Sequence, residues 1–367
     1  MRFPEFSGEW VTKSINDLAV VIGGGTPDTT VKSYWDGEIQ WFTPSEIGKN
    51  KYVDSSLRTI TEVGLNNSSA KLLPPNTILL SSRATIGECS LSLRECATNQ
   101  GFQCLVSKKC NVDFLYYLIQ TKKKDLIRKS CGSTFLEISA NEVRKIQVSV
   151  PSDVEQQKIA ELLSLIDERI ATQNKIIEDL KKLKSAIRKK MFSLLKDEYT
   201  ESFEINQLLD YEQPTAYIVA NDEYSTDTSL TPVLTANKGF ILGYTDEKFG
   251  IYQKGECIIF DDFTMDAKYV SFPFKVKSSA IKILTAKPNV NLRFMFEYLS
   301  YWELKSEEHK RHYISEIASL VIELPSKERQ SIIASLMTSL NSKLDIEAKT
   351  KIRYEEQKRY LLSQMFI

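Results

Sequence analysis

Apolar residues recur in steps of three and four along two long stretches of this chain. Residues 151–197 carry Ile159, Leu163, Ile166, Ile170, Ile177, Leu180, Ile187, Met191 and Leu194, and residues 325–367 carry Ile333, Met337, Leu340, Leu344, Tyr354, Leu361 and Met365. A mean period of 3.5 residues is the apolar seam of a coiled coil, so both stretches are predicted to be helices. At 1.5 Å per residue, each helix would be roughly 60 Å long.

Polar residues interrupt both seams. Gln173 and Lys184 stand in the first, and Glu347, Lys351 and Lys358 stand in the second. Polar seam positions weaken a coiled coil but help to fix its register. The helices alone leave open a purely structural coiled coil that has no part in recognition.

Capping residues mark where each helix is expected to begin. Ser152 and Glu155 form an S-x-x-E pattern, which predicts a capping box at the start of the first helix. Ser326 can cap the second helix, but Arg329 occupies the reciprocal position, so that capping box is incomplete.

The two helices are copies of one sequence pattern. The segment that opens at Pro151 matches, position for position, the segment that opens at Pro325. We call the separation of these two prolines in the sequence the repeat offset. The register holds without a gap for about 40 residues, which identifies an internal repeat of very long period. The chain is therefore organised as two halves.

A mixed globule is expected before each helix. Asn111 and Asn291 each open a similar helical segment, and the turns at Asn76 and Gly255 each lead into an apolar strand. The rest of the two globules diverges. We predict domains at residues 1–150, 151–197, 198–324 and 325–367, in the order globule, long helix, different globule, long helix.

Composition limits the possible partners. Lys and Arg number 48, and Asp and Glu also number 48, so DNA binding would depend on local positive charge and would be weak for the chain alone. The six cysteines form no CxxC pair, which favours reduced thiols in a cytoplasmic protein. We expect no secretory signal and no membrane-spanning segment.

Motifs for catalysis are missing from the sequence. Pro74-Pro75 lacks the flanking residues of an adenine methyltransferase loop, and Pro27 argues against a phosphate-cradling helix after the glycine run 23–25. His309 and His312 are the only histidines, and their spacing favours a solvated helical face over a metal site. Asp261 and Asp262 are adjacent in an expected strand, where their side chains would point to opposite faces. We therefore predict no enzyme and no metal site.

Two like helices with unlike globules would suit the reading of two different DNA half-sites, so polar or basic residues in each globule are the candidate contacts. Arg side chains read guanine, Asn and Gln read adenine, and Lys positions a protein on phosphates. The candidates are Thr26, Lys32, Arg83, Thr85, Asn99, Gln100 and Lys122 in the first globule and Lys238, Lys268, Tyr269, Lys275 and Lys277 in the second. Lys122 begins a basic stretch that includes residues 123–124 and 128–129.

With these segments in place, the chain resembles the specificity subunits of the type I restriction–modification family. The resemblance covers essentially the whole length. It is carried by Trp10-Val-Thr-Lys-Ser-Ile-Asn-Asp-Leu, Gly23-Gly-Gly-Thr-Pro27, Ile39-Gln-Trp41, Ser82-Arg-Ala-Thr-Ile-Gly87, Gln156-Gln-Lys-Ile-Ala160 and the repeated segment at Pro325. The second globule lacks the glycine loop but contains Phe260-Asp-Asp-Phe-Thr264 and Lys275-Val-Lys-Ser-Ser-Ala280, which are similar to segments of some members.

The resemblance implies an α+β protein with two mixed α/β target-recognition domains, each followed by one helix of an antiparallel coiled coil. It implies a bipartite double-stranded DNA target with an unread spacer, two methyltransferase subunits and motor-nuclease restriction subunits. S-adenosylmethionine, ATP and Mg would be bound by those partners and no cofactor by this chain.

Other interpretations remain open from the sequence. One is a specificity subunit that serves a fused methyltransferase–nuclease, and another is a coiled-coil scaffold with two protein-binding globules. An autonomous nuclease or methylase is disfavoured by the missing motifs.

Overall fold

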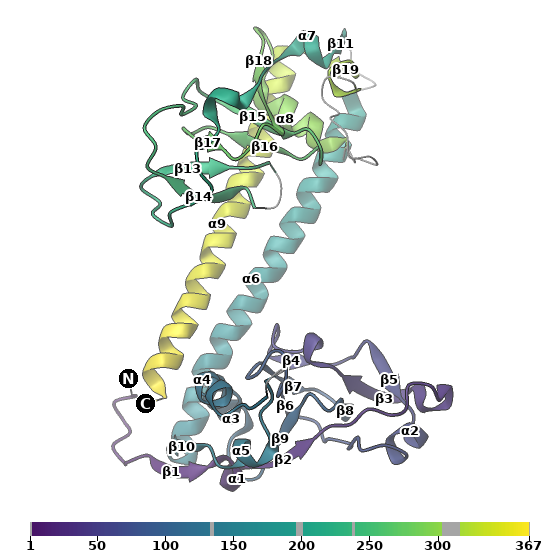
Figure 1. Ribbon diagram of the computed structural model, residues 1–367, viewed down its shortest axis with the longest axis vertical. Helices are drawn as coiled ribbons and strands as arrows, with labels where there is room; N and C mark the ends of the chain where they lie inside the picture. Colours follow the sequence, from purple (N-terminus) through teal and green to yellow (C-terminus); the bar gives the residue numbers. More distant parts are fainter. Residues whose placement is uncertain (1, 133–135, 196–200, 237–238, 303–315, 367) are drawn as a thin grey trace. The chain divides into compact units, whose positions relative to one another are not determined.

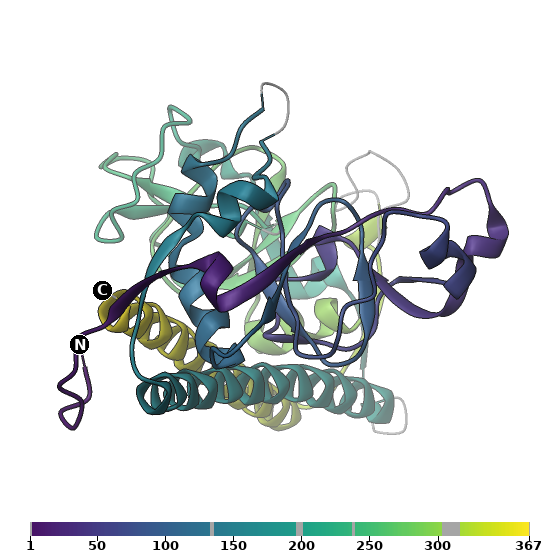
Figure 2. The same cartoon turned by 90° about the horizontal axis from the view of Figure 1, so that it is seen from below.

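The computed structural model describes residues 2–132, 136–195, 201–236, 239–302 and 316–366. The chain packs as two compact units. Unit 1 comprises Met1–Asn174 with Lys349–Ile367, and unit 2 comprises Lys175–Ala348. Two long helices, α6 (Asp153–Leu194) and α9 (Lys327–Met365), each contribute one segment to each unit, where the segments lie alongside each other (Figure 1 and Figure 2).

The long helices pair in opposite directions, as expected for an antiparallel coiled coil. In unit 1 the beginning of α6 packs with the end of α9, through Ile159, Leu163, Ile166, Leu361 and Met365. In unit 2 the end of α6 packs with the beginning of α9, through Ile187, Met191, Ile333, Met337 and Leu340. The predicted seam is confirmed at these positions, but the prediction is wrong at the end of α6. Leu194 is exposed, and its neighbours Phe192 and Leu195 are buried instead.

Both helix starts are capped by serine, but the predicted capping box at Ser152 is only half formed. The backbone N–H of Glu155 donates to Ser152 Oγ at 3.4 Å, whereas the Glu155 carboxylate accepts from Arg2 and Trp10. Glu155 is 1% exposed, so its charge needs the guanidinium of Arg2. At α9 the N–H of Arg329 donates to Ser326 Oγ at 3.3 Å, as predicted.

Unit 1 contains three sheets. A two-stranded sheet pairs β1 (Val11–Ser14) with β10 (Gln147–Val150). A five-stranded sheet has the order β2 (Ala19–Gly23), β9 (Gln103–Ser107), β6 (Ile78–Leu80), β7 (Cys89–Ser92) and β4 (Tyr52–Val53). A third sheet has the order β5 (Arg58–Ile60), β3 (Trp35–Phe42) and β8 (Cys96–Thr98). The helices are α1 (Ile15–Leu18), α2 (Glu62–Asn66), α3 (Val112–Thr121), α4 (Lys123–Arg128) and α5 (Ala140–Arg144), with 3-10 turns η1 (Lys32–Tyr34) and η2 (Pro44–Glu46).

The described residues of unit 2 repeat this plan with fewer strands. It pairs β11 (Glu201–Glu204) with β19 (Val321–Leu324). A four-stranded sheet has the order β12 (Leu209–Glu212), β18 (Ile281–Ala286), β15 (Cys257–Asp261) and β16 (Ala267–Val270). A three-stranded sheet has the order β14 (Ile241–Thr245), β13 (Thr231–Leu234) and β17 (Lys275–Val276). The unit also contains α7 (Ile205–Leu208), α8 (Leu292–Tyr301) and the 3-10 turn η4 (Pro214–Tyr217).

The repeat extends well beyond the long helices. The order strand, one-turn helix, strand opens both units, and the strands β2, β9 and β6 correspond to β12, β18 and β15. The turns predicted to lead into β6 and β15 have positive φ values, 62° at Asn76 and 106° at Gly255. The outer strands of the sheets and the loops differ between the units.

A buried glutamine joins each globule to its long helix in the same way. Gln156 donates to the carbonyl of Pro151 and accepts from the N–H of Asn111, and Asn111 caps α3 through the N–H of Phe114. In unit 2, Gln330 makes the same two bonds to Pro325 and Asn291, and Asn291 caps α8. The amide of glutamine is needed there because one side chain must accept and donate at once.

The cysteines have structural surroundings. All six are free, and burial raises the pKa of Cys89, Cys96 and Cys104 to about 12. These three thiols stay protonated and pack as small apolar groups. Among the helices of the described residues, none combines the length and apolarity needed to cross a bilayer.

Candidate nucleic-acid interface

Most candidates of the first globule gather at one edge of its five-stranded sheet. Strands β2, β9 and β6 are antiparallel neighbours, so the end of β2, the start of β9 and the end of β6 lie at the same edge. The three loops that leave this edge hold Thr26, then Asn99 and Gln100, then Arg83 and Thr85. Backbone hydrogen bonds join the loops, from Gly25 to Thr98 and from Ser82 to Gly101. We call residues 24–27, 81–85 and 98–101 the reading edge of unit 1.

The glycine run exists because this loop passes very close to its neighbours. A Cβ on Gly24 would lie 2.0 Å from the carbonyl oxygen of Asn99, and one on Gly25 would lie 2.2 Å from Ser69 Oγ. Trp41 Nε1 donates to the carbonyl of Gly25 at 3.0 Å and fixes the loop at that point. Thr26 then donates to the side chain of Gln100. The loop is a tight packed turn, and it fixes two candidate side chains against each other.

Arg83 projects from the reading edge with a partner already in place. Its Nε lies 2.9 Å from the carboxylate of Glu137, and 42% of its side chain is exposed. Ala84, next to it, has a φ of 53°, so the loop bends sharply at this point. Thr85 is exposed and donates to Ser81 Oγ at 3.1 Å. Guanine contact by Arg83 would have to use the nitrogens that Glu137 leaves accessible.

The other basic candidates of unit 1 lie elsewhere. Lys32 is exposed on η1, and Lys122 is half-buried at the end of α3. The basic stretch that follows is offset by acids, since Lys123 pairs with Glu88, Arg128 with Asp125 and Lys129 with Glu142. This surface therefore carries less net positive charge than its sequence indicates.

The described candidates of unit 2 lie on β16 and on or just after β17. Lys268 is half-exposed on β16 and Lys277 is exposed after β17. Tyr269 is half-buried, the guanidinium of Arg293 lies 3.9 Å from the centre of its ring, and burial raises its pKa. Lys238 lies outside the described residues.

Lys275 has an environment that does not agree with its predicted role as a DNA contact. Its side chain is 1% exposed and its Nζ lies 2.7 Å from the carboxylate of Glu247. It also donates to the carbonyl of Phe249, and the hydrogen bond from Lys275 holds the pKa of Glu247 below its ordinary value. A phosphate contact would require this buried pair to break, so we assign Lys275 a structural role.

Sequence reasoning missed the edge of unit 2 that corresponds to the reading edge. The ends of β12 and β15 and the start of β18 place Gln213, Asp262 and Lys282 there. Lys282 lies 3.3 Å from Asp262 and donates to Gln213 at 3.0 Å, and both charged side chains are 1% exposed. The signal that could have revealed it is the correspondence of the turns at Asn76 and Gly255, continued to the ends of the strands that they open.

The acidic pair at positions 261 and 262 has two separate structural functions. Asp261 accepts from the backbone N–H groups of Phe263 and Thr264, whereas Asp262 pairs with Lys282. The two carboxylates therefore do not share a ligand. Across the residues that the structure describes, no three His, Cys, Asp or Glu side chains are close enough to hold a metal ion. His309 and His312 lie outside that part of the chain.

We expect Asp262→Ala to lower the free energy of unfolding of unit 2 by about 3 kcal/mol, because it leaves the buried ammonium of Lys282 without its counter-charge. Urea denaturation measures the change. Asp246→Ala removes an exposed carboxylate of the same unit and is the matched control, expected within about 0.5 kcal/mol of the parent. Equal stability of the two variants would contradict the structural role of Asp262.

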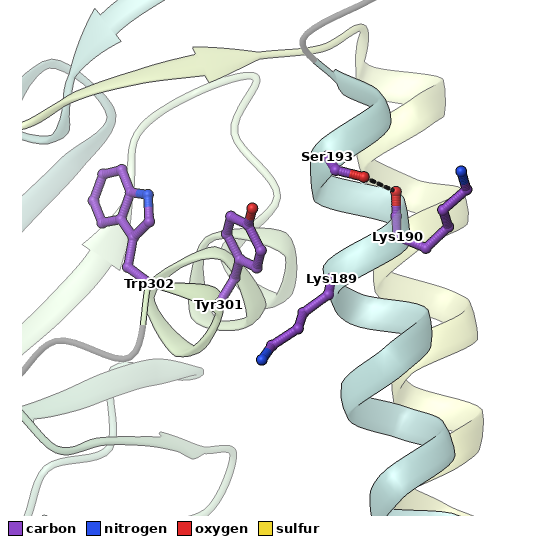
Figure 3. A pocket seen from close by; sticks show the side chains of 5 residues that line it. All are labelled: Lys189, Lys190, Ser193, Tyr301 and Trp302. Carbon is purple, nitrogen blue, oxygen red and sulfur yellow. Dashed lines mark hydrogen bonds between the residues drawn. The ribbon is translucent and has the colours of Figure 1, made fainter.

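A cavity of unit 2 lies between the end of α6 and the end of α8. Lys189, Lys190 and Ser193 of α6 and Tyr301 and Trp302 of the α8 end line a volume of about 640 Å³. Figure 3 shows Lys189 on the side of α6 that faces the two rings, with its side chain extending below Tyr301, and Lys190 directed away from them. Ser193 Oγ donates to the carbonyl of Lys190 at 2.9 Å, so the hydroxyl is engaged with its own helix. These five lining side chains include no carboxylate, thiol or imidazole.

Comparison with known proteins identifies the two halves. The family model for the type I restriction modification DNA specificity domain matches residues 7–182 and residues 198–356. The specificity subunit of type I restriction enzyme MjaIX from Methanocaldococcus jannaschii is 38% identical over 216 residues, 58% of this chain and 50% of that protein. A type I restriction enzyme specificity subunit from Escherichia coli is 39% identical over 178 residues, 43% of each chain. This chain thus spans about half the length of these two relatives.

A solved structure has a similar fold. The S subunit of a type I restriction–modification system from M. genitalium superposes with a TM-score of 0.65 at 16% identity, over 100% of this chain and 99% of that one. At this identity the likeness shows a shared fold: mixed α/β globules with long helices. Since the family model matches nearly the whole chain, once in each half, this protein is a member of the type I restriction–modification DNA specificity family.

Proposed function

We propose that this chain is the sequence-reading subunit of a type I restriction–modification complex, with recognition domains at residues 1–150 and 198–324. Each domain binds one half of a bipartite double-stranded DNA target. The chain performs no catalysis itself. It directs two methyltransferase subunits, and motor-nuclease subunits where they are present, to adenines in the target. S-adenosylmethionine, ATP and Mg are bound by those partners, in the cytoplasm.

The observation that carries this proposal is the double occurrence of one domain plan with two different edges. In unit 1 the edge presents the glycine loop with Thr26, Gln100 and Arg83. The corresponding edge of unit 2 contains a buried ion pair between Asp262 and Lys282 in place of that loop. Repeated supports with unlike ends suit the reading of two unlike half-sites, because base contacts, not the scaffold, determine which sequence is bound.

Single-molecule sequencing for methylated adenine tests the proposal. Hosts with the gene and its neighbouring methyltransferase gene are expected to carry a split methylated motif, and hosts that lack only this gene are expected to lose it. An unchanged methylome would favour a coiled-coil scaffold that has no part in DNA recognition.

The isolated chain is expected to bind DNA weakly. Its 48 basic and 48 acidic residues cancel, and in unit 1 the candidate Arg83 and two residues of the basic stretch, Lys123 and Arg128, are paired with acids. Since phosphate contacts supply much of the affinity of DNA-binding proteins, partner subunits must supply positive charge. Fluorescence anisotropy should report an affinity at least about 100-fold higher once methyltransferase subunits are added, and a less steep salt dependence for the chain alone. Tight, sequence-specific binding by the chain alone would contradict this expectation.

A further inference from the structure

In unit 1, three polar side chains meet where the globule contacts both long helices. The hydroxyl of Tyr117, from α3, donates to the carboxylate of Asp167 in α6 at 2.7 Å. Lys358 of α9 lies 2.7 Å from the same carboxylate and 5.5 Å from the centre of the Tyr117 ring. The side chains of Asp167 and Lys358 are 16% and 18% exposed, and Tyr117 is fully buried. We call these three residues node 1.

In unit 2, a second cluster lies at the equivalent junction. Glu297 of α8 is completely buried and accepts from Nε and Nη2 of Arg188 in α6, at 3.0 and 2.8 Å. Asn341 of α9 donates to the other carboxylate oxygen at 3.3 Å. Lys184 is half-buried one turn before Arg188, and burial lowers its pKa while the charge of Glu297 opposes that shift. We call these four residues node 2.

The nodes occupy corresponding positions of the internal repeat. The repeat offset, which carries Pro151 onto Pro325, also carries Asp167 onto Asn341 and Lys184 onto Lys358. The asparagines that cap α3 and α8 align Tyr117 with Glu297, since each lies six positions after its cap. Each node therefore has one acid, one lysine of the long helices and one neutral polar group. Node 2 also has Arg188, and Leu362 stands at the corresponding position of α9. The acid, however, stands on the long helix in node 1 and on the globule helix in node 2.

A second pair of positions, one turn earlier on the globule helices, shows the same exchange of charge. Asp113 of α3 lies 2.6 Å from Lys51, whose Nζ also donates to Ser164 of α6 at 2.7 Å. The corresponding residue of α8 is Arg293, which donates from Nε to Thr338 of α9 at 3.2 Å. Ser164 and Thr338 are themselves related by the repeat offset. The globule helix thus presents an acid in one unit and a base in the other.

We infer that node 1 and node 2 are positioning sites that seat each globule on the helix pair, and that their exchanged charges match each globule to its own seat. A buried carboxylate is stable only where its counter-charge and hydrogen-bond donors are in place, so a wrong seat leaves a charge unpaired. Polar groups in an apolar seam select register for the same reason. When these charges are paired, α3 and α8 can each adopt only one orientation on α6 and α9.

The consequence for DNA reading rests on the proposed function. α3 connects the seat of globule 1 to the sheet that carries the reading edge, so a loosened seat would let the reading edge change its angle. Residues of node 1 would therefore influence recognition of one half-site without contacting DNA. They act through the position of Thr26, Gln100 and Arg83.

Transplanting the charge arrangement of node 2 into node 1 tests this inference. Tyr117→Glu alone places two carboxylates beside one lysine, and Asp167→Asn alone leaves Lys358 without its acid. The double variant Tyr117→Glu/Asp167→Asn restores one acid opposite one lysine and places the acid on the globule helix, as in node 2. It does not supply a counterpart of Arg188, because Leu362 stands at that position. Glu168→Gln, at the exposed neighbouring position, removes one acid outside the node and is the matched control.

Hydrogen exchange of the α3 amides, with the α8 amides of the same molecule as internal reference, gives the first measurement. Each single variant should accelerate α3 exchange roughly tenfold or more, and the double variant should recover most of that loss, as expected for coupled residues of one network. The control should match the parent. Silent single variants, or a double variant with the summed loss of both, would overturn the inference. If the unit 1 variants do not fold, the same test can be made in unit 2. There the exchange of the double variant Glu297→Tyr/Asn341→Asp is compared with that of its two single variants.

Methylation of the two half-sites gives the second measurement. The single variants should impair recognition of one half-site and the double variant should restore it. Loss of coupling in hydrogen exchange with intact methylation would refute the nodes and leave the proposed function standing. Coupling in hydrogen exchange without any methylated motif would refute the proposed function and leave the nodes standing.

Discussion

With one heptad added to each long helix, we expect the recognised DNA sequence to keep both half-sites and to gain base pairs between them. Seven residues extend a helix by about 10 Å, and DNA repeats every 34–36 Å per turn, so the spacer should lengthen by at most about three base pairs. An ideal helix rotates only about 20° per heptad away from the seam, so the apolar contacts survive the insertion. Each added base pair also rotates one half-site about the DNA axis relative to the other, and this rotation opposes lengthening of the spacer. An increase of one or two base pairs is therefore also consistent with the prediction.

The insertions belong after Asn174 and Ala348, where the two units divide and which the repeat offset relates to each other. Methylome sequencing of the variant reads the spacer directly. A heptad in α6 alone shifts the seam against α9 and is expected to abolish methylation, which controls for tolerance of any insertion. If the variant with both insertions methylates the parental motif, the helices do not determine the spacer.

The sequence predicted the long helices well because their information is local and repeated. Ile159, Leu163, Met337 and Leu361 are buried where the 3.5-residue period places them. The prediction for the end of the first seam was wrong. Leu194 follows the period but is exposed, because the last turn of α6 buries Phe192 and Leu195 in the core of unit 2.

The pairing of the terminal strands could not be predicted in the same way. β1 pairs with β10 although the rest of the first globule lies between them in the sequence, and β11 pairs with β19 in the same manner. β1 and β11 are four-residue strands whose burial does not alternate, so their sequences carry little pattern and their partners depend on tertiary contacts. The segments Ile15-Asn-Asp-Leu18 and Ile205-Asn-Gln-Leu208 do repeat, and they form the one-turn helices α1 and α7.

The candidate DNA contacts show where single residues mislead. Residue type cannot distinguish Lys275, which is buried beside Glu247, from Lys277, which is exposed two positions later. Alternation along a strand would place both on one face, and the difference arises because β17 ends between them. By contrast, Thr26, Arg83 and Gln100 come together because three neighbouring strands end at one edge, which sheet topology decides and sequence spacing does not.

The charge arrangement of the two nodes could likewise not be predicted from the sequence. Lys184 and Lys358 were recognised as polar interruptions of the seams, but their partners stand on different kinds of helix. Tyr117 and Glu297 occupy corresponding positions of the two halves. Because their side chains are dissimilar, a search for similar residues in the two halves does not detect this position. Complementary differences at corresponding positions become visible only when the contacts of each unit are known.

Arg83→Ala should relax or abolish recognition of one half-site and leave the other intact. A guanidinium that reads a guanine contributes about 1–3 kcal/mol of discrimination, so the preference for the correct base should fall roughly 5- to 150-fold at one position. Arg83 lies on the reading edge with 42% of its side chain exposed, and its pairing with Glu137 orients it. Competition between matched and single-base-changed duplexes, read with the methyltransferase subunits present, measures the effect at each position.

Two variants separate a base contact from a structural defect. Glu137→Gln removes the same ion pair but keeps the guanidinium, so it should lose less discrimination than Arg83→Ala does. Lys277→Ala removes an exposed charge of unit 2 and should leave the half-site that depends on Arg83 unaffected. Equal losses at both half-sites in Arg83→Ala would indicate unfolding of unit 1, and equal losses in Arg83→Ala and Glu137→Gln would reduce Arg83 to a support of its loop.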